Sequence, residues 1–130
     1  MITDNYIKMC EKAEEIQKSN INIGKRHFNN QDFVAYNCGE GLKIYVCSEI
    51  SRYWLIKELI WLPTQEQLQE ISGIPWWRFD KRCDGVRCCL LEDPLNNIEI
   101  RTKEEAGICV VMEKKYNKIW NGEKWVKGNE

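Results

Sequence analysis

Apolar side chains recur at helical spacing near the start of the chain. They follow the i, i+3, i+4, i+7 rhythm of one helix face, while lysine and glutamate fill the positions between them. Thr3 or Asp4 can cap the first turn. The pattern predicts an amphipathic helix over residues 4–19, followed by a loop over residues 20–31, where no period survives. The apolar positions are Tyr6, Met9, Cys10, Ala13 and Ile16.

A second pattern, typical of a β-hairpin, begins at residue 33. The segments FVAYN (33–37) and LKIYVCSE (42–49) flank four residues that include Gly39 and Gly41, and the second segment alternates apolar and polar side chains. Two glycines in so short a loop supply the positive φ angles that a tight hairpin needs. Residues 50–62 fit both strand and helix, and a strand is predicted only near 59–62.

Two capping boxes predict helix starts in the second half of the chain. Thr64 with Gln67 opens a short helix that stops at Gly73, and the polar positions of this helix are expected to be solvated. Thr102 with Glu105 opens a longer helix over about residues 103–120. The solvated positions of the short helix are Gln65, Glu66, Gln69 and Glu70.

The intervening stretch IPWWRFDKRCDGVRCCLLEDP is harder to assign. Asp84-Gly85 is a hairpin-turn signal, so RFDKRC (78–83) and VRCCLLE (86–92) are predicted to pair as strands. IEIR (98–101) and EKWV (123–126) are predicted as further short strands. The whole pattern predicts one α+β domain over residues 1–130: a small, mainly antiparallel sheet with N-terminal and C-terminal helices and one short middle helix.

Composition narrows the classes of function. Hydrophobic residues make up 43% and charged residues 30% of the 130 residues, and the formal net charge is −1. This balance is typical of a globular chain without the overall positive charge of a nucleic-acid or anionic-membrane binder. No apolar run reaches membrane-span length, and the N-terminus lacks the apolar core of a secretory signal. We therefore expect a cytoplasmic protein with no membrane partner.

Catalytic signatures are scarce in the sequence. His27, the single histidine, has no arranged serine or cysteine partner, and it is expected to be a solvated loop residue. The chain contains no GxGxxG, GxxxxGK[ST] or HExxH motif. No catalytic residue and no cofactor are assigned, and a non-enzymatic role is favoured over an enzymatic one.

Seven cysteines raise the alternative of a zinc site. Cys38 and Cys47, at either side of the hairpin, could meet Cys83 with Cys88 or Cys89 in a tetrahedral thiolate site. The chain contains no CxxC knuckle, which zinc ribbons and fingers normally use. Buried or incidental thiols are the favoured interpretation, and zinc is the weakest of the alternatives.

The aromatic and basic segment over residues 76–89 is the candidate binding surface. Six tryptophans are expected to serve mostly as core, with Trp76 or Trp77 in excess as an exposed contact. Arginine interleaved with tryptophan is also how some proteins hold single-stranded nucleic acid. The alternative is that the aromatic rings are core and the arginines form a solvated face. The candidate binding residues are Trp76, Trp77, Arg78, Arg82 and Arg87.

Two stretches carry a resemblance to a known group. WLPTQEQLQEI (61–71) and MEKKYNKIWNGEKWV (112–126) resemble the WLPxQxQLQ and KxYxKxWxGEKWV signatures of small uncharacterised proteins encoded by phages and prophages of low-GC Gram-positive bacteria. Residues 73–101 and the cysteines match no part of that pattern. The resemblance implies an origin and related folds, and no catalytic residue.

Three functions follow as hypotheses. The first is a phage accessory protein of the bacterial host cytoplasm that binds another protein or itself without catalysis. The second is a nucleic-acid-associated module that uses the segment over residues 76–89. The third is the cysteine-ligated zinc module.

Overall fold

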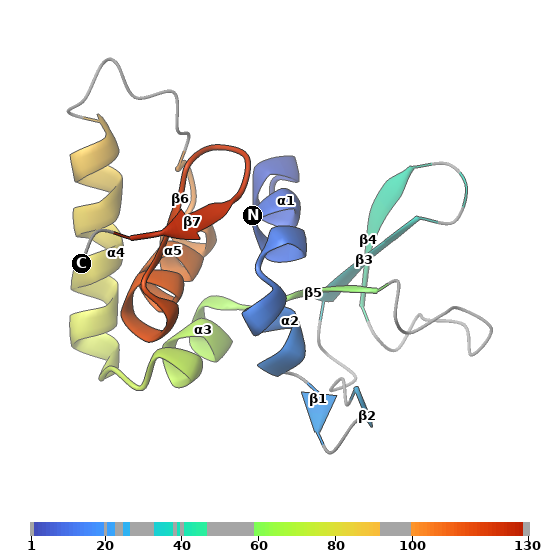
Figure 1. Ribbon diagram of the computed structural model, residues 1–130, viewed down its shortest axis with the longest axis horizontal. Helices are drawn as coiled ribbons and strands as arrows, with labels where there is room; N and C mark the ends of the chain where they lie inside the picture. The colour runs from blue at the N-terminus through green and yellow to red at the C-terminus, as the bar shows by residue number, and fades with distance from the viewer. Residues whose placement is uncertain are drawn as a thin grey trace.

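The computed structural model describes residues 2–19, 21–22, 25–26, 33–37, 39, 41–46, 59–91 and 100–128, and it has the expected α+β architecture (Figure 1). Five helices are seen in these ranges: α1 (Asp4–Lys12), α2 (Glu14–Ser19), α3 (Gln65–Ser72), α4 (Trp76–Leu91) and α5 (Lys103–Tyr116). The strands are β1 (Ile21–Asn22), β2 (Lys25–Arg26), β3 (Phe33–Asn37), β4 (Leu42–Val46), β5 (Ile60–Leu62), β6 (Lys118–Trp120) and β7 (Trp125–Lys127).

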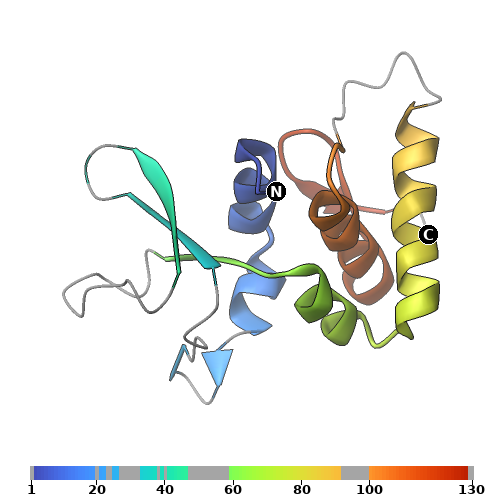
Figure 2. The same ribbon diagram turned by 180° about the vertical axis from the view of Figure 1, so that it is seen from behind.

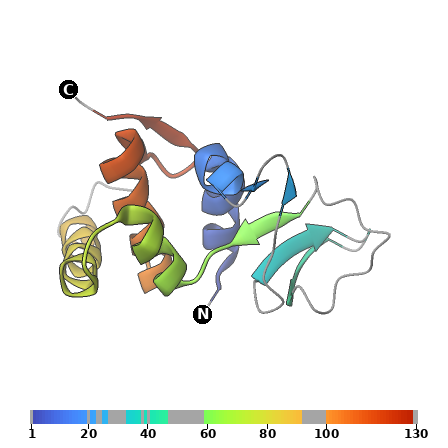
Figure 3. The ribbon, with the colours of Figure 1, turned by 90° about the horizontal axis from the view of Figure 1, so that it is seen from below.

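The main elements lie in a row. In Figures 1 and 2, α4 stands at one end, α5 lies beside it, α1 follows, and the sheet of β3, β4 and β5 projects from the far side of α1. The view from below in Figure 3 shows the same separation of helices and sheet. The row has two exposed ends, and α4 forms one of them.

The predicted N-terminal helix is confirmed, with a break that the sequence did not indicate. Thr3 caps it, because its Oγ1 accepts the Tyr6 N–H at 3.0 Å. All five apolar positions of the predicted stripe are fully buried. At Ala13 the helix ends, since the Ala13 N–H bonds to the Cys10 carbonyl, and α2 restarts at the next residue.

The break leaves carbonyl groups of α1 open to partners from distant segments. The Met9 carbonyl, which a continuous helix would pair with Ala13, accepts a hydrogen bond from Trp125 Nε1 at 3.0 Å. The Cys10 carbonyl also accepts from Gln17 Nε2 at 3.1 Å. Helix α1 therefore holds the C-terminal hairpin through one of its own backbone groups.

The predicted hairpin is confirmed. β3 and β4 are antiparallel from Phe33 opposite Val46 to Asn37 opposite Leu42, and both loop glycines have positive φ, 102° at Gly39 and 98° at Gly41. The predicted strand near residues 59–62 is also confirmed as β5, which pairs with the other edge of β3. Residues 47–58 lie outside the described residues.

Gln17 closes the free edge of β5. Its Oε1 accepts the Trp61 N–H at 2.7 Å, and its Nε2 donates to the Trp61 carbonyl at 2.9 Å. One side-chain amide thus satisfies both backbone groups that a neighbouring strand would otherwise take. Beside it, the buried Tyr6 hydroxyl donates to the Pro63 carbonyl at 2.6 Å. Helices α1 and α2 are joined to the sheet through these bonds.

Both capping boxes form as predicted. Thr64 caps α3 with Gln67, and the helix ends at Gly73 in the left-handed conformation, with φ of 71°. Thr102 caps α5 with Glu105. Glu105 is buried, and its second oxygen accepts from Asn5 Nδ2 at 2.6 Å. The start of α5 is therefore fixed both by its own cap and by α1.

The predicted strand pair over residues 78–83 and 86–92 is wrong, because this segment is the sixteen-residue helix α4. Phe79, Cys83 and Val86 are spaced four and three residues apart, so they lie on one helical stripe, with Phe79 and Cys83 fully buried and Val86 half-buried. Gly85 stands in the helix interior without a positive φ. Burial of this helical stripe prevails over the local turn signal of Asp84-Gly85, and α4 is a helix that the sequence did not predict.

Three smaller corrections concern boundaries. Helix α5 ends at Tyr116 rather than near residue 120, because Asn117 adopts the left-handed conformation with φ of 52° and its N–H returns to the Met112 and Glu113 carbonyls. Residues 118–120 instead form β6, paired with β7, the strand predicted within residues 123–126. Ile100 and Arg101 are not a strand, and residues 98–99 are not described.

The predicted loop over residues 20–31 contains a short antiparallel ladder, in which Ile21 lies opposite Arg26 and Asn22 opposite Lys25. His27, the expected loop histidine, lies outside the described ranges.

Two helical glycines provide a matched test of the packing. A Cβ at Gly107 would stand 3.0 Å from Gln65 Oε1 and from Leu68 Cδ1, and 3.3 Å from Phe79 Cζ, whereas one at Gly85 would meet nothing within 4 Å. We expect Gly85→Ala to raise the free energy of unfolding by about 1 kcal/mol through helix propensity. We expect Gly107→Ala to lower it by about 1–2 kcal/mol through overpacking. Urea denaturation measures both, and equal stabilisation by the two variants would contradict this account of the α3–α4–α5 contact.

Loss of the Gln17 amide should weaken the joint between helix and sheet. Gln17→Leu leaves the Trp61 N–H and carbonyl without their partners, so we expect the free energy of unfolding to fall by about 1–3 kcal/mol. The Trp61 amide should also exchange with solvent deuterium much faster. Glu14→Leu, an exposed position on the same helix, is the control and should change stability by less than about 0.5 kcal/mol.

Candidate functional site

Helix α4 presents two large aromatic side chains to solvent. Trp76 is 48% exposed and Trp77 is 67% exposed, the largest exposure among the large hydrophobic side chains of the described residues. The Trp76 ring lies parallel to that of Phe79, with centroids 6.1 Å apart, and this contact ties it to the buried side of the helix. Trp77 has no such ring partner among the described residues. The indole of Trp77 is therefore the most prominent apolar group on this end of the molecule.

Basic side chains lie beside Trp77, on one side of it around the helix. Arg78, Lys81 and Arg82 are all exposed, and none takes part in an ion pair or side-chain hydrogen bond within the described part of the chain. Lys81 lies one turn after Trp77, and Arg82 one turn after Arg78, because side chains four residues apart are neighbours on a helix. We call Trp77, Arg78, Lys81 and Arg82 the α4 outer face.

The acidic residues of α4 do not neutralise this face. The Asp80 carboxylate pairs with Lys103 of α5 at 3.1 Å, which ties α4 to α5 and occupies that charge. Asp84 is the one other acidic residue in Trp76–Leu91, and it is exposed. The α4 outer face therefore keeps a positive balance.

Four of the five binding residues predicted from sequence are exposed on α4: Trp76, Trp77, Arg78 and Arg82. The side chain of Arg87 lies outside the described part. Lys81 was not assigned to the site from sequence. Its spacing of four residues from Trp77 is the signal that would have found it, once the segment is read as a helix.

The described cysteines are neutral thiols. Burial raises the pKa of Cys83 to about 11, an effect reduced by its hydrogen bond from Gln65 Nε2 at 3.6 Å. Burial also raises the pKa of Cys10 and of Cys109 well above the ordinary value. A thiolate is the form that binds zinc or attacks an electrophile, so these three side chains behave as small core residues.

Of the proposed zinc ligands, only Cys83 has a side chain within the described residues. Cys83 is buried in the core, while Cys38, Cys47 and the side chain of Cys88 lie outside the described part of the chain. The described ranges contain no cluster of three histidine, cysteine or acidic side chains arranged to hold a metal ion.

The four polar residues of α3 that were expected to be solvated fall into two groups. Glu66 and Glu70 are exposed, as expected. Gln69 instead donates through Nε2 to the Ile74 carbonyl at 2.6 Å, which supports the turn after the helix. Gln65 turns toward α4 and α5, where its Oε1 is buried without a hydrogen-bond partner. The two glutamines therefore have structural contacts, and α3 presents no converging polar group for chemistry.

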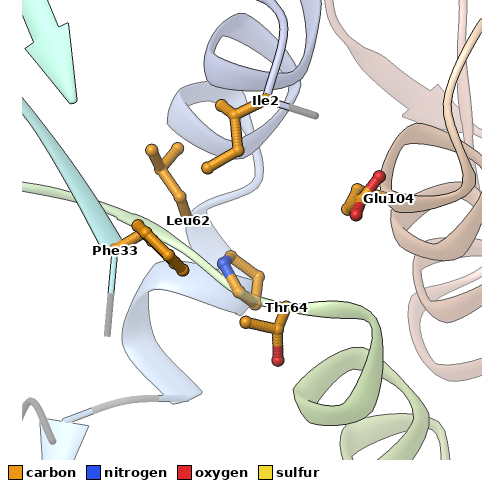
Figure 4. A pocket seen from close by; sticks show the side chains of 6 residues that line it. Ile2, Phe33, Leu62, Thr64 and Glu104 are labelled. Atoms are coloured by element: carbon orange, nitrogen blue, oxygen red, sulfur yellow. The ribbon is translucent and has the colours of Figure 1, made fainter. Parts of the chain in front are cut away.

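A shallow hollow of about 330 Å³ lies where the N-terminus, the sheet and the starts of α3 and α5 meet (Figure 4). In Figure 4 its hydrocarbon wall faces Thr64, and Glu104 stands apart on the side of α5. The Thr64 hydroxyl already accepts the Gln67 N–H as the α3 cap. The hollow is therefore mainly an apolar depression. It is lined by Ile2, Phe33, Leu62, Pro63, Thr64 and Glu104.

Helix α4 is the longest helix of the described ranges, and it is amphipathic and charged. No helix within the described ranges is both long and apolar enough to cross a bilayer.

The raised pKa of Cys83 predicts a pH dependence of stability. The unfolded thiol ionises near its ordinary pKa of 9.0, whereas the folded thiol stays protonated to about 11. The unfolded state therefore loses its proton first as pH rises, and this contribution to stability is complete below pH 9 and lost through pH 11. We expect the free energy of unfolding of the native protein to fall more steeply from pH 9 to 10.5 than that of Cys83→Ala. Parallel pH profiles in urea denaturation would show that Cys83 contributes nothing to this dependence.

Comparison with known proteins leaves the surface geometry as the basis for a functional assignment. No family model, no curated protein and no solved structure matches the chain.

Proposed function

We propose that this protein acts without catalysis, by binding another protein through the α4 outer face. The observation that carries the proposal is the 67% exposure of Trp77 in a chain whose other described tryptophans outside α4 are all buried. Covering an indole of this size removes a large apolar area from water, and tryptophan is among the residues most enriched at binding hot spots. A partner that covers Trp77 gains this stabilisation.

The rigidity of α4 supports the same proposal. Phe79 and Cys83 anchor the helix in the core, and the Asp80–Lys103 pair joins it to α5. A side chain on a packed helix is already oriented, so little conformational entropy is lost when a partner binds it. The α4 outer face is thus suited to recognition by a rigid docking contact.

The biological setting is part of the proposal and rests on the resemblance to phage and prophage proteins. The two segments that carry the resemblance have structural roles in this fold. Thr64 and Gln67 cap α3, and the rings of Trp120 and Trp125 pack together in the β6–β7 hairpin with their centroids 5.1 Å apart. A signature of this kind marks a shared fold, and α4 lies outside it. We accordingly propose an accessory protein of phage type, acting in the host cytoplasm, whose partner is set by α4.

Nucleic-acid binding is the second candidate, favoured by one observation: cationic side chains stand beside an exposed indole. Single-stranded nucleic acid is held by stacking of bases on aromatic rings together with phosphate contacts to lysine and arginine. Such binding weakens steeply with salt, since counterions are released from the phosphates.

Replacement of Trp77 tests the protein-binding proposal. Affinity capture from phage-infected cells with the native chain should recover a specific protein partner, and Trp77→Ala should reduce its recovery at least tenfold, because loss of a hot-spot indole costs about 2 kcal/mol or more. The measurement is quantitative mass spectrometry of the captured proteins.

Ile119→Ala is the matched control, since Ile119 is a 48% exposed apolar side chain on a different element. It should leave recovery unchanged, and both variants should unfold at the same urea concentration as the native chain. Identical recovery by Trp77→Ala and the native chain would overturn the proposal.

A further inference from the structure

We infer that the α4 outer face binds an acidic protein segment, one in which carboxylates flank an apolar side chain that covers Trp77. This inference rests on the proposed function and names the chemistry of the partner. The inference follows from the positive charges that lie beside the exposed indole of Trp77.

Three cationic side chains of the α4 outer face are available to an acidic partner. Arg78, Lys81 and Arg82 are exposed and lack ion-pair partners within the described residues, whereas Asp80 is already paired with Lys103. The whole chain carries a net charge of −1, so it is close to neutral, and these three cations are a local concentration of positive charge. An acidic surface would be attracted to this face, which favours docking in one orientation.

The spacing of the arginines specifies the arrangement of carboxylates. Arg78 and Arg82 are one helical turn apart, about 6 Å along α4. Guanidinium groups bind carboxylates through two parallel hydrogen bonds, which lysine cannot form. Matching carboxylates stand about one turn apart on a partner helix, or two residues apart on an extended strand, where the separation is about 7 Å and so close to that of the arginines. The apolar residue of the partner then lies beside this pair, over Trp77.

A second copy of the chain fits this face less well. Symmetrical pairing of two α4 helices would place Arg78, Lys81 and Arg82 opposite the same cations of the partner copy, and like charges across an interface are unfavourable. One exposed acidic residue, Asp84, stands against these three cations on each helix. The α4 outer face is therefore suited to a different protein rather than to its own copy.

A polynucleotide also fits less well than a protein. Single strands are held by several stacking rings along a continuous cationic track, whereas Trp76 is already stacked on Phe79 and Trp77 alone is free of ring partners among the described residues. The three cations of α4 and one free indole form a compact site rather than such a track. A short acidic segment matches a site of this size.

A displayed peptide library tests the partner class. The full chain, immobilised, is used to select binders from a yeast-displayed library of random sixteen-residue peptides, and Trp77→Ala removes binders that do not need the α4 outer face. We expect the surviving peptides to be enriched in Asp or Glu at spacings of two to four residues around an apolar residue. The double variant Arg78→Glu/Arg82→Glu should weaken their binding at least tenfold, as should an increase in salt from 50 to 500 mM.

Lys124→Glu/Lys127→Glu, which makes the same charge change at exposed positions of the β6–β7 hairpin, should change binding by less than twofold. All variants are first checked for native circular dichroism and urea midpoints. A twenty-nucleotide single-stranded DNA is measured in parallel as the competing class of ligand.

The outcomes separate the two proposals. Trp77-dependent peptides without acidic enrichment, or without sensitivity to the arginine reversals, would overturn the acidic partner and leave the protein-binding function standing. A library without any Trp77-dependent peptide would overturn both. Tighter, Trp77-dependent binding of the DNA than of the best peptide would replace both with the nucleic-acid alternative.

Discussion

The joint between Gln17 and Trp61 holds the two halves of this molecule together. The side-chain amide of a short helix substitutes for a neighbouring strand, at 2.7 and 2.9 Å, and so ends the sheet against the helices without leaving backbone groups unpaired. It can do so because the helix breaks at Ala13, which turns Gln17 toward both β5 and the Cys10 carbonyl. The same break frees the Met9 carbonyl for Trp125, so one local irregularity organises contacts with both the sheet and the C-terminal hairpin.

Local signals in the sequence predicted much of this fold. The apolar stripe of the first helix, the β3–β4 hairpin and both capping boxes depend on residues a few positions apart, where spacing alone carries the information. The contacts that join these elements to one another depend on residues far apart in the sequence. Gln17 and Trp61 are 44 residues apart, and Asn5 and Glu105 are 100 residues apart, so nothing in their sequence neighbourhoods identifies them as partners.

The residue types of the candidate site could be identified from the sequence, but their arrangement in space could not. Its residue types marked it in the sequence, since two adjacent tryptophans are followed by three arginines and a lysine within ten residues. Its geometry could not be predicted, because Asp84-Gly85 is a strong turn signal when judged locally. The stripe of Phe79, Cys83 and Val86 outweighs that signal only when α5 is present to receive it. Tertiary packing thus converted two expected strands into one helix, and thereby placed Lys81 beside Trp77.

The division of α4 into an anchored side and an exposed side has a consequence for how such a protein can diversify. Phe79 and Cys83 hold the helix in place, while Trp77, Arg78 and Lys81 contribute little to folding because they face solvent. Mutations on the exposed side can therefore accumulate almost free of the stability threshold that constrains the core. Substitutions at a few solvent-facing positions of α4 would therefore change the chemistry of this surface, while the cap of α3 and the packing of the C-terminal hairpin stay intact.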